Sequence, residues 1–311
     1  MVITVAVERP TIAQRDYNLP RKVNGPVGFS LIELLVVISI IAMLMAILVP
    51  VLSIARFKAR TLLKMSYQGQ IVVAGTNYAN EHNDEYPGSP AVLGTEKDGW
   101  GWQEPTMLTG FNDRSPAGHR SMAEYLRGYI DDGKVAFCPN APKKYKYFEE
   151  AWRAGDDWVN PTAPWPSPVF GTYCFYWNYI GYLEDDGSLF VGPKGPAGGG
   201  AQSSVVVTDY FGYDHWRSRH CFGSCEPLQG GQITEGTPES SAYWSRHDSG
   251  GMAEPESLAV ELHAGYFDGH VDKYSPPDVV PMRVSLTCDG RTPYPAGVGP
   301  GVFYLPRDGV E

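Results

Sequence analysis

The stretch that decides the fold runs from residue 34 to residue 55 and reads LLVVISIIAMLMAILVPVLSIA, 22 residues without a charge. As an α-helix with a rise of about 1.5 Å per residue, it extends about 33 Å, which is enough to cross the hydrocarbon core of a bilayer. A buried core helix is the alternative, but so long an uncharged run is rare in soluble domains. The sequence therefore predicts a membrane-spanning helix over about residues 31–55.

Two residues distinguish this segment from an ordinary signal peptide. Glu33 lies at its N-terminal edge, where a carboxylate is costly unless another charge pairs with it. Pro50 lies inside it, where it removes one helix hydrogen bond and favours a kink. A secretory signal explains neither residue, because its apolar stretch is shorter and ends in a small-residue cleavage site. The residues around Ala46 imitate such a site, so a signal peptide is the alternative.

The six residues at 28–33 are GFSLIE, and a basic leader precedes them. This stretch resembles the processing site of type IV prepilins and type II secretion pseudopilins, which a prepilin peptidase cleaves and methylates on the cytoplasmic side. The resemblance implies a cleavable leader at residues 1–28, a cut after Gly28 and a mature chain that begins with a methylated Phe29. It also implies that Glu33, as the fifth mature residue, pairs with the N-terminal amine of a neighbouring subunit.

The charges after the apolar segment point the other way. Four basic residues follow it within ten positions: Arg56, Lys58, Arg60 and Lys64. The positive-inside rule alone would place this end of the segment in the cytoplasm. We follow the processing site, which implies a single-pass protein of the bacterial inner membrane. Its head would lie in the periplasm, or outside the cell after assembly.

The helical pattern continues beyond the apolar segment. Apolar residues recur at spacings of four, four, three and four: Leu63, Tyr67, Ile71, Ala74 and Tyr78. One apolar stripe of this kind is typical of an amphipathic helix that packs on a domain. The polar residues at 80–84 and the Pro87-Gly88 pair end the pattern. We therefore expect a stem helix of about 50 residues within 29–85, followed by a globular head at 86–311.

The head is expected to be rich in short strands and long loops. Aromatic and β-branched runs predict strands at Tyr173–Ile180 and Ser204–Thr208, and a short helix capped by Ser121 is predicted at Arg120–Ile130. The clearest hairpin is Ala264–Tyr274, in which Asp268-Gly269 suits a type I′ turn. The predicted fold class is α+β: a long pilin-type helix packed on an antiparallel β-sheet head.

A second resemblance concerns the C-terminal part of the chain. The residues RHDSGG at 246–251, followed by FDGHV at 267–271, resemble the C-terminal processing-associated domain of large planctomycete, verrucomicrobial and lentisphaeral prepilins. That domain has a His, nine intervening residues and Asp-Gly, whereas twenty residues separate His247 from Asp268 here. The resemblance implies pilin-like assembly and a motif of unknown role: His247, Asp268, Gly269 and His270.

The cysteines and histidines raise the question of a metal site. Four residues form the pattern H-x4-H-C-x3-C: His215, His220, Cys221 and Cys225. Imidazole and thiolate are the usual ligands of zinc, but the spacing matches no common zinc module. An exported head would favour a Cys221–Cys225 disulfide, or loop thiols without a metal, instead. The five cysteines permit one or two disulfides, whose connectivity the sequence leaves open.

Composition excludes several functional classes. A net charge of −10 and a pI near 5.2 argue against nucleic acid as a partner. The chain has no nucleophile elbow, phosphate loop or dinucleotide fingerprint, so we expect neither an enzyme nor a cofactor. The expected function is a structural subunit, a pseudopilin or minor pilin of a type II secretion or type IV pilus-like filament. Its expected partners are prepilin peptidase, other pilin-like subunits and the inner membrane.

Two other hypotheses assign the head an activity of its own. In the first, the stem anchors a binding module that captures polysaccharide or protein at the surface. Stacking of sugar rings would use tryptophans in polar or Pro/Gly-rich contexts, and the candidates are Trp100, Trp102, Trp152, Trp158 and Trp165. In the second, the head is a secreted enzyme that the stem tethers. Filament co-assembly, glycan binding and hydrolytic activity would distinguish the three.

Overall fold

The structure is a computed structural model, and the chain divides into two compact units, Met1–Ser53 and Ile54–Glu311. The residues that the structure describes are 29–91, 105–109, 121–141, 148–154, 169–183, 188–198, 201, 203–213, 222–223, 225, 233–234, 244–246, 260–275, 278–283 and 302–310.

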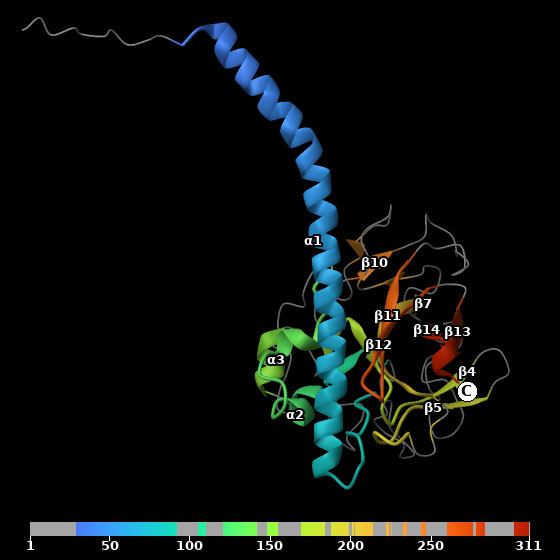
Figure 1. The fold of residues 1–311 in the computed structure, drawn as a ribbon. Coiled ribbons are helices and arrows are strands. Elements are labelled where there is room, and N and C mark those ends of the chain that lie inside the picture. Colours follow the sequence, from blue (N-terminus) through green and yellow to red (C-terminus); the bar gives the residue numbers. More distant parts are fainter. Residues whose placement is uncertain are drawn as a thin grey trace, which may run out of the picture. The chain divides into compact units, whose positions relative to one another are not determined.

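Helix α1 (Leu31–Glu81) has 51 residues and continues through Pro50 (Figure 1). Its first turn is closed by a reciprocal cap, since the Ser30 N–H donates to Glu33 Oε2 at 2.9 Å and the Ile32 N–H donates to Ser30 Oγ at 3.1 Å. Every described residue of the first unit, from Phe29 to Ser53, is exposed. Among the described helices, α1 alone is long and apolar enough to span a membrane.

The second half of α1 has one buried face. Its buried residues are Lys64, Tyr67, Gln68, Ile71, Val72, Ala74, Gly75 and Ala79. The predicted stripe is therefore correct at Tyr67, Ile71 and Ala74, but Leu63 is 42% exposed and Tyr78 is only half-buried. The buried face is turned toward residues 64 and 68, because polar partners lie in the sheet opposite them.

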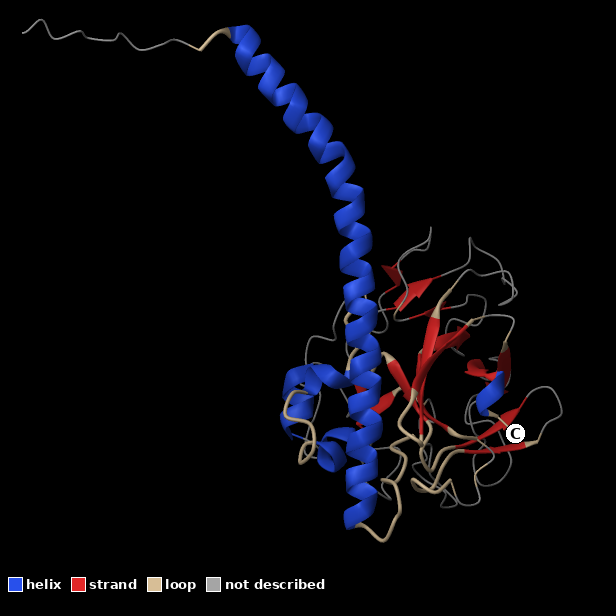
Figure 2. Ribbon diagram, viewed as in Figure 1, coloured by secondary structure: helices blue, strands red, loops and turns tan. Residues whose placement is uncertain are grey.

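A four-stranded antiparallel sheet packs against this face, in the order β12-β11-β6-β3 (Figure 2). Its strands are β3 (Tyr173–Phe175), β6 (Val205–Asp209), β11 (Leu262–Tyr266) and β12 (Val271–Tyr274). Glycine at 265 lets the helix approach, because a Cβ there would lie 2.9 Å from Val72 Cγ2 and 3.0 Å from Val207 Cγ1. The strand predicted at Ser204–Thr208 is confirmed as β6, and the one predicted at Tyr173–Ile180 is interrupted at Asn178, whose φ is 52°.

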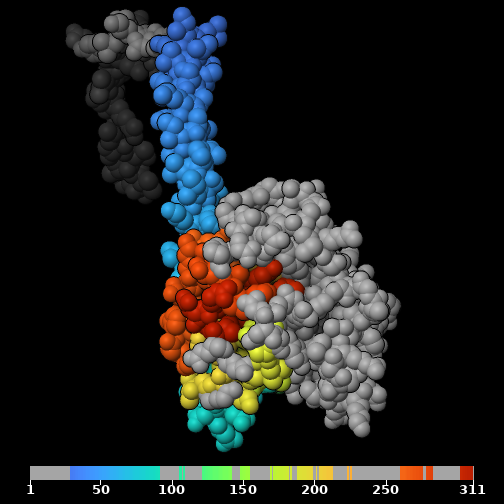
Figure 3. Space-filling view, turned by 90° about the vertical axis from the view of Figure 1, so that its right-hand side faces the viewer, coloured from blue at the N-terminus to red at the C-terminus, as the bar shows by residue number. Residues whose placement is uncertain are grey.

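A second antiparallel sheet has eight strands in the order β5-β4-β13-β14-β7-β8-β10-β9. Its strands are β4 (Ile180–Leu183), β5 (Leu189–Val191), β7 (Phe211–Tyr213), β8 (Phe222–Gly223), β9 (Ile233–Thr234), β10 (Trp244–Arg246), β13 (Val279–Arg283) and β14 (Val302–Pro306). A small pair, β1 (Met107–Thr109) and β2 (Val169–Phe170), and the 3-10 helix η4 (Arg307–Gly309) complete the set. In Figure 3 the C-terminal segments, in orange and red, gather on one face of the head.

The two larger sheets share one core. The chain passes from β6 to β7 through Tyr210 alone, so the two sheets are joined at Asp209 and Phe211. Aromatic rings pack in this core, including Tyr176, just after β3, against Phe190 of β5 at a centroid distance of 5.7 Å, and Phe211 of β7 against Tyr304 of β14 at 5.7 Å. The prediction of an α+β fold with antiparallel sheets is confirmed.

Short helices lie near α1, across it from β11 and β12 in the view of Figures 1 and 2. They are α2 (Met122–Leu126), the 3-10 helix η1 (Gly133–Ala136) and α3 (Phe148–Ala154). The predicted cap is confirmed, since the Ser121 side chain accepts a hydrogen bond from the Ala123 N–H at 3.1 Å. Helix α2 is shorter than the predicted range of Arg120–Ile130.

The hairpin of β11 and β12 is confirmed, but its predicted turn type is wrong. The Gly269 N–H donates to the Tyr266 carbonyl at 2.9 Å, and the Tyr266 N–H donates to the His270 carbonyl at 3.0 Å. Only Gly269, with φ of 97°, has a positive φ in this turn, whereas a type I′ turn needs two such residues. The three-residue loop thus matches a type I turn followed by a glycine bulge.

Candidate functional site: a buried ion pair between α1 and the sheet

Asp209, the last residue of β6, is the centre of a buried polar cluster on the helix-facing side of the four-stranded sheet. Lys64 Nζ donates to Asp209 Oδ2 at 2.6 Å, and the side chains of both residues are at most 1% exposed. Gln68 Nε2 donates to Asp209 Oδ1 at 3.0 Å, and the His263 N–H donates to Oδ2 at 2.9 Å. We call Lys64, Gln68, Asp209 and His263 the anchor cluster.

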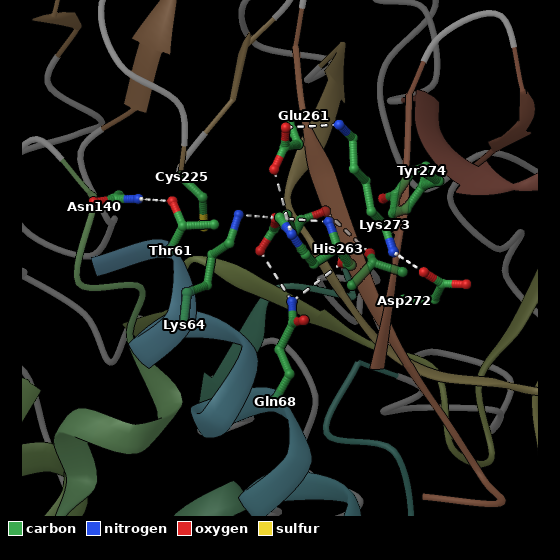
Figure 4. Close-up of polar contacts among 12 residues, drawn as sticks. Thr61, Lys64, Gln68, Asn140, Cys225, Glu261, His263, Asp272, Lys273 and Tyr274 are labelled. Carbon is green, nitrogen blue, oxygen red and sulfur yellow. Dashed lines mark hydrogen bonds and ion pairs between the residues drawn. The ribbon is translucent and has the colours of Figure 1, made fainter. Parts of the chain in front are cut away.

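Local structure explains how these four residues meet. Lys64 and Gln68 are one helical turn apart, so both side chains leave α1 on the same face. On the sheet, Ala264 pairs with Thr208, which brings the neighbouring residues His263 and Asp209 together across β11 and β6. Figure 4 shows Lys64 and Gln68 reaching from the helix toward His263 on its strand. The helix is thus held at one position along its axis by two adjacent turns.

A chain of polar groups leads from the anchor cluster to the surface. His263 Nε2 lies 3.7 Å from Glu261 Oε1, and Glu261 Oε2 accepts a hydrogen bond from Lys273 Nζ at 2.7 Å. The side chains of Glu261 and Lys273 are about half exposed. The hydrogen bond from Lys273 is the main reason that the pKa of Glu261 is lowered. His263 therefore lies between the exposed charges of Glu261 and Lys273 and the buried carboxylate of Asp209 (Figure 4).

Opposing effects set the ionisation of Asp209. Burial alone would raise the pKa of this carboxyl, but the adjacent Lys64 ammonium and the hydrogen bond from His263 outweigh burial, so the pKa is lowered. Asp209 is therefore a carboxylate at neutral pH. Because its partners are buried with it, the cluster offers no group to a solute, and its chemistry is that of a fixed, fully desolvated ion pair.

Two weaker polar contacts support α1 on either side of the anchor cluster. Asn140 Nδ2 donates to Thr61 Oγ1 at 3.3 Å, which ties the loop after η1 to the helix (Figure 4). Near the C-terminal end of α1, the Tyr129 hydroxyl donates to Glu81 Oε2 at 2.6 Å, and this bond raises the pKa of Tyr129 to about 12. Within the described part of the head, these polar contacts thus hold the helix at three levels, of which the middle one is fully buried.

The predicted processing residues lie at the other end of α1. Gly28 is outside the described residues, and Phe29 is exposed. Glu33 accepts the Ser30 N–H and so caps the helix, a role that the sequence analysis did not assign to it. The capping pattern Ser-x-x-Glu at residues 30–33 was the signal that could have shown it.

The predicted motif of unknown role is only partly described. Asp268, Gly269 and His270 form the exposed turn between β11 and β12, where His270 Nδ1 lies 2.5 Å from Asp268 Oδ1. The His270 ring stacks on Tyr266 at a centroid distance of 4.2 Å. His247 lies outside the described residues. The structure therefore brings Asp268, Gly269 and His270 together in one turn, and the prediction for His247 falls outside the described part of the chain.

Other candidates from the sequence have mixed outcomes. Of the proposed zinc pattern, only Cys225 is described, and it is buried; within the described residues no group of three metal-binding side chains is present. Trp152 is buried against Phe148 and is not available to stack on a sugar. The other four tryptophan candidates lie outside the described residues.

The anchor cluster is not predicted by any motif in the sequence. Lys64 is the last of four cations after the apolar segment, and Gln68 and Asp209 belong to no recognisable pattern. A lysine among residues spaced for a buried helix face, at positions 64, 67, 71 and 74, was the available signal. It was weak because a lysine at the edge of such a stripe usually extends into water. Comparison of the chain with family models, with curated proteins and with solved structures found no match.

Proposed function

We propose that this chain is a structural subunit, a pseudopilin or minor pilin of a type II secretion or type IV pilus-like filament, that prepilin peptidase processes. One observation carries the proposal. Helix α1 exposes its large apolar side chains from Leu31 to Ile54, while its second half is held in the head by the anchor cluster. An apolar surface of this length requires lipid, or the apolar helices of other subunits, around it.

The anchor cluster suits a subunit that is moved by its stem. Assembly into a filament, or extraction from a membrane, would pull on α1 while the head stays attached. A helix held only by apolar packing can shift along its axis by a turn, because apolar contacts are not directional. The Lys64–Asp209 pair opposes such a shift, since displacing Lys64 leaves a buried carboxylate without its partner charge.

Glu33 provides the decisive test, because two roles can be separated at this residue. A glutamine keeps the oxygen that accepts the Ser30 N–H but has no charge, whereas an alanine loses both. If Glu33 pairs with the N-terminal amine of a neighbouring subunit, Glu33→Gln and Glu33→Ala fail equally in assembly. If Glu33 only caps the helix, Glu33→Gln assembles normally.

The experiment expresses the full chain, leader included, in a bacterium that has a prepilin peptidase. The cleaved and methylated fraction is measured by intact mass, and incorporation is measured in sheared filaments or crosslinked oligomers. We expect normal cleavage after Gly28 and incorporation of Glu33→Gln reduced by about tenfold or more, which corresponds to about 1.4 kcal/mol per contact. Normal incorporation of Glu33→Gln would reject the pairing role. A chain that starts near Ala46 would reject the prepilin assignment altogether.

A further inference from the structure

Two cysteine thiols meet in the core of the head beside the anchor cluster. Cys138 follows η1, and Cys225 follows β8; both are buried. Each contacts Thr172: the Cys138 N–H donates to Thr172 Oγ1 at 2.6 Å, and Cys225 Sγ donates to the Thr172 carbonyl at 3.9 Å. Burial, and after it the interaction with the Cys138 side chain, raises the pKa of the Cys225 thiol, so the two side chains are near neighbours. Two cysteines far apart in the sequence thus meet at one buried residue, Thr172.

We propose that Cys138 and Cys225 are joined by a disulfide in the mature protein. The inference rests on the proposed function, which places the head in an oxidising compartment outside the cytoplasm. The two S–H bonds break and one S–S bond forms. The two electrons and two protons pass to the disulfide of a thiol–disulfide oxidoreductase, which becomes a dithiol. The Cys221–Cys225 pairing considered from the sequence competes for the same sulfur.

The surroundings indicate when this bond must form. Burial is the main cause that raises the pKa of the Cys225 thiol, and the interaction with Cys138 and the negative charge of Asp209 raise it further. A thiolate is the attacking species in disulfide exchange, so the folded pair reacts slowly. Oxidation therefore belongs to folding, before the head closes over the two sulfur atoms.

The position of the pair gives the bond a mechanical role. Tyr173, which directly follows Thr172, pairs with Asp209 across β3 and β6. Two residues after Cys138, Asn140 contacts Thr61 of α1. A Cys138–Cys225 disulfide would therefore tie the loop that supports the stem to the core beside the anchor cluster.

Cys174 provides a matched control. It is also buried and directly follows Tyr173 in β3, so its side chain lies on the opposite face of that strand. Its thiol acts on Tyr176, on that opposite face. A serine at 174 removes a buried thiol without touching the proposed bond.

The test uses the full chain, purified in detergent from bacterial membranes after blocking thiols with an alkylating reagent. Peptide mapping without reduction should recover one crosslinked pair that contains Cys138 and Cys225, about 2 Da lighter than the two free peptides. Reduction should lower the melting temperature of wild-type and Cys174→Ser protein by about 5–10 °C. It should not change the melting temperature of Cys138→Ser or Cys225→Ser.

A second arm separates this inference from the proposed function. It is used if the first arm finds both cysteines alkylated. A second preparation, made without the alkylating reagent, is then reacted with glutathione disulfide just below its melting temperature, where transient opening exposes both thiols. Formation of the Cys138–Cys225 pair only in this arm supports the pairing and rejects the oxidising location. No such pair in either arm, with the head accessible to protease from outside the cell, overturns the disulfide and leaves the proposed function standing. A Cys221–Cys225 peptide also overturns it.

Discussion

The two halves of α1 belong to one helix but are built for different surroundings. Residues 31–53 carry a single charge, Glu33, and every one of them is exposed. Residues 54–81 carry charges on their outer face, and they bury apolar side chains together with Lys64 and Gln68 on the other. The first half is suited to lipid or to other helices, and the second half is suited to one particular sheet.

The comparison also changes how the charges after the apolar segment are counted. Arg56, Lys58 and Arg60 are exposed, but Lys64 is buried and paired with Asp209. A cation neutralised inside a folded head does not act as a free charge at the membrane surface. In the folded protein three of these four cations are thus exposed.

The largest expected effect comes from removing the second half of α1 in addition to the first. A fragment of residues 54–311 should fold as a soluble protein, because it keeps the buried face of α1 and loses only the exposed apolar half. A fragment of residues 86–311 should not fold, because the sheet residues around Asp209 and Gly265 lose their cover. Near-ultraviolet circular dichroism and thermal unfolding compare the two. A cooperative unfolding transition in the shorter fragment would show that the second half is dispensable.

Replacing the buried cation should have the next largest effect. Lys64→Met in the fragment 54–311 keeps most of the side-chain volume but leaves the Asp209 carboxylate buried without a partner charge. Urea unfolding should show a loss of about 3–5 kcal/mol. The control is Arg60→Met, which removes an exposed cation one turn earlier and should change stability by less than about 0.5 kcal/mol. Equal losses of stability in the two variants would show that the buried Lys64–Asp209 pair has no special stabilising role.

Two glycine substitutions should change stability in opposite directions. In Gly265→Ala the new Cβ would lie 2.9 Å from Val72 Cγ2, so α1 must move away from β11, at a cost of about 1–3 kcal/mol. In Gly69→Ala the nearest atom is Val271 Cγ2 at 3.8 Å, and the helix gains about 0.5–1 kcal/mol from the better helix former. Both are measured by urea unfolding. A loss at residue 69 as large as that at residue 265 would mean that helix and sheet are packed differently.

The smallest expected effect is a change in pH dependence. The pKa of Asp209 is lowered in the folded state, so its contribution to stability is complete above the unfolded value of about 3.9 and is lost as pH falls through the folded value. Melting temperatures of the fragment 54–311 and its Asp209→Asn variant, measured between about pH 7 and pH 2, should converge in acid. Parallel curves would show that Asp209 does not titrate with folding.

Local patterns were sufficient for much of the fold. The uncharged run, the apolar spacing after it, the Ser121 cap and the Asp268-Gly269 turn each depend on residues within a few positions of one another, so the sequence alone identified the long helix, α2 and the β11–β12 hairpin. The turn type was missed because Asp268 and Gly269 suit several hairpin loops, and the pairing of Gly265 with Val271 decided among them.

Only the tertiary structure decided which side chains are joined. Lys64 and Asp209 are 145 positions apart, and nothing near either residue indicates the other. Their meeting depends on the order of strands in the sheet and on the rotation of α1, which is set by the packing of Gly265 against Val72. The same holds for Cys138 and Cys225, which are brought together through Thr172. Helix and strand periods are local properties of a chain, whereas the partner of a buried charge or thiol is a property of the whole fold.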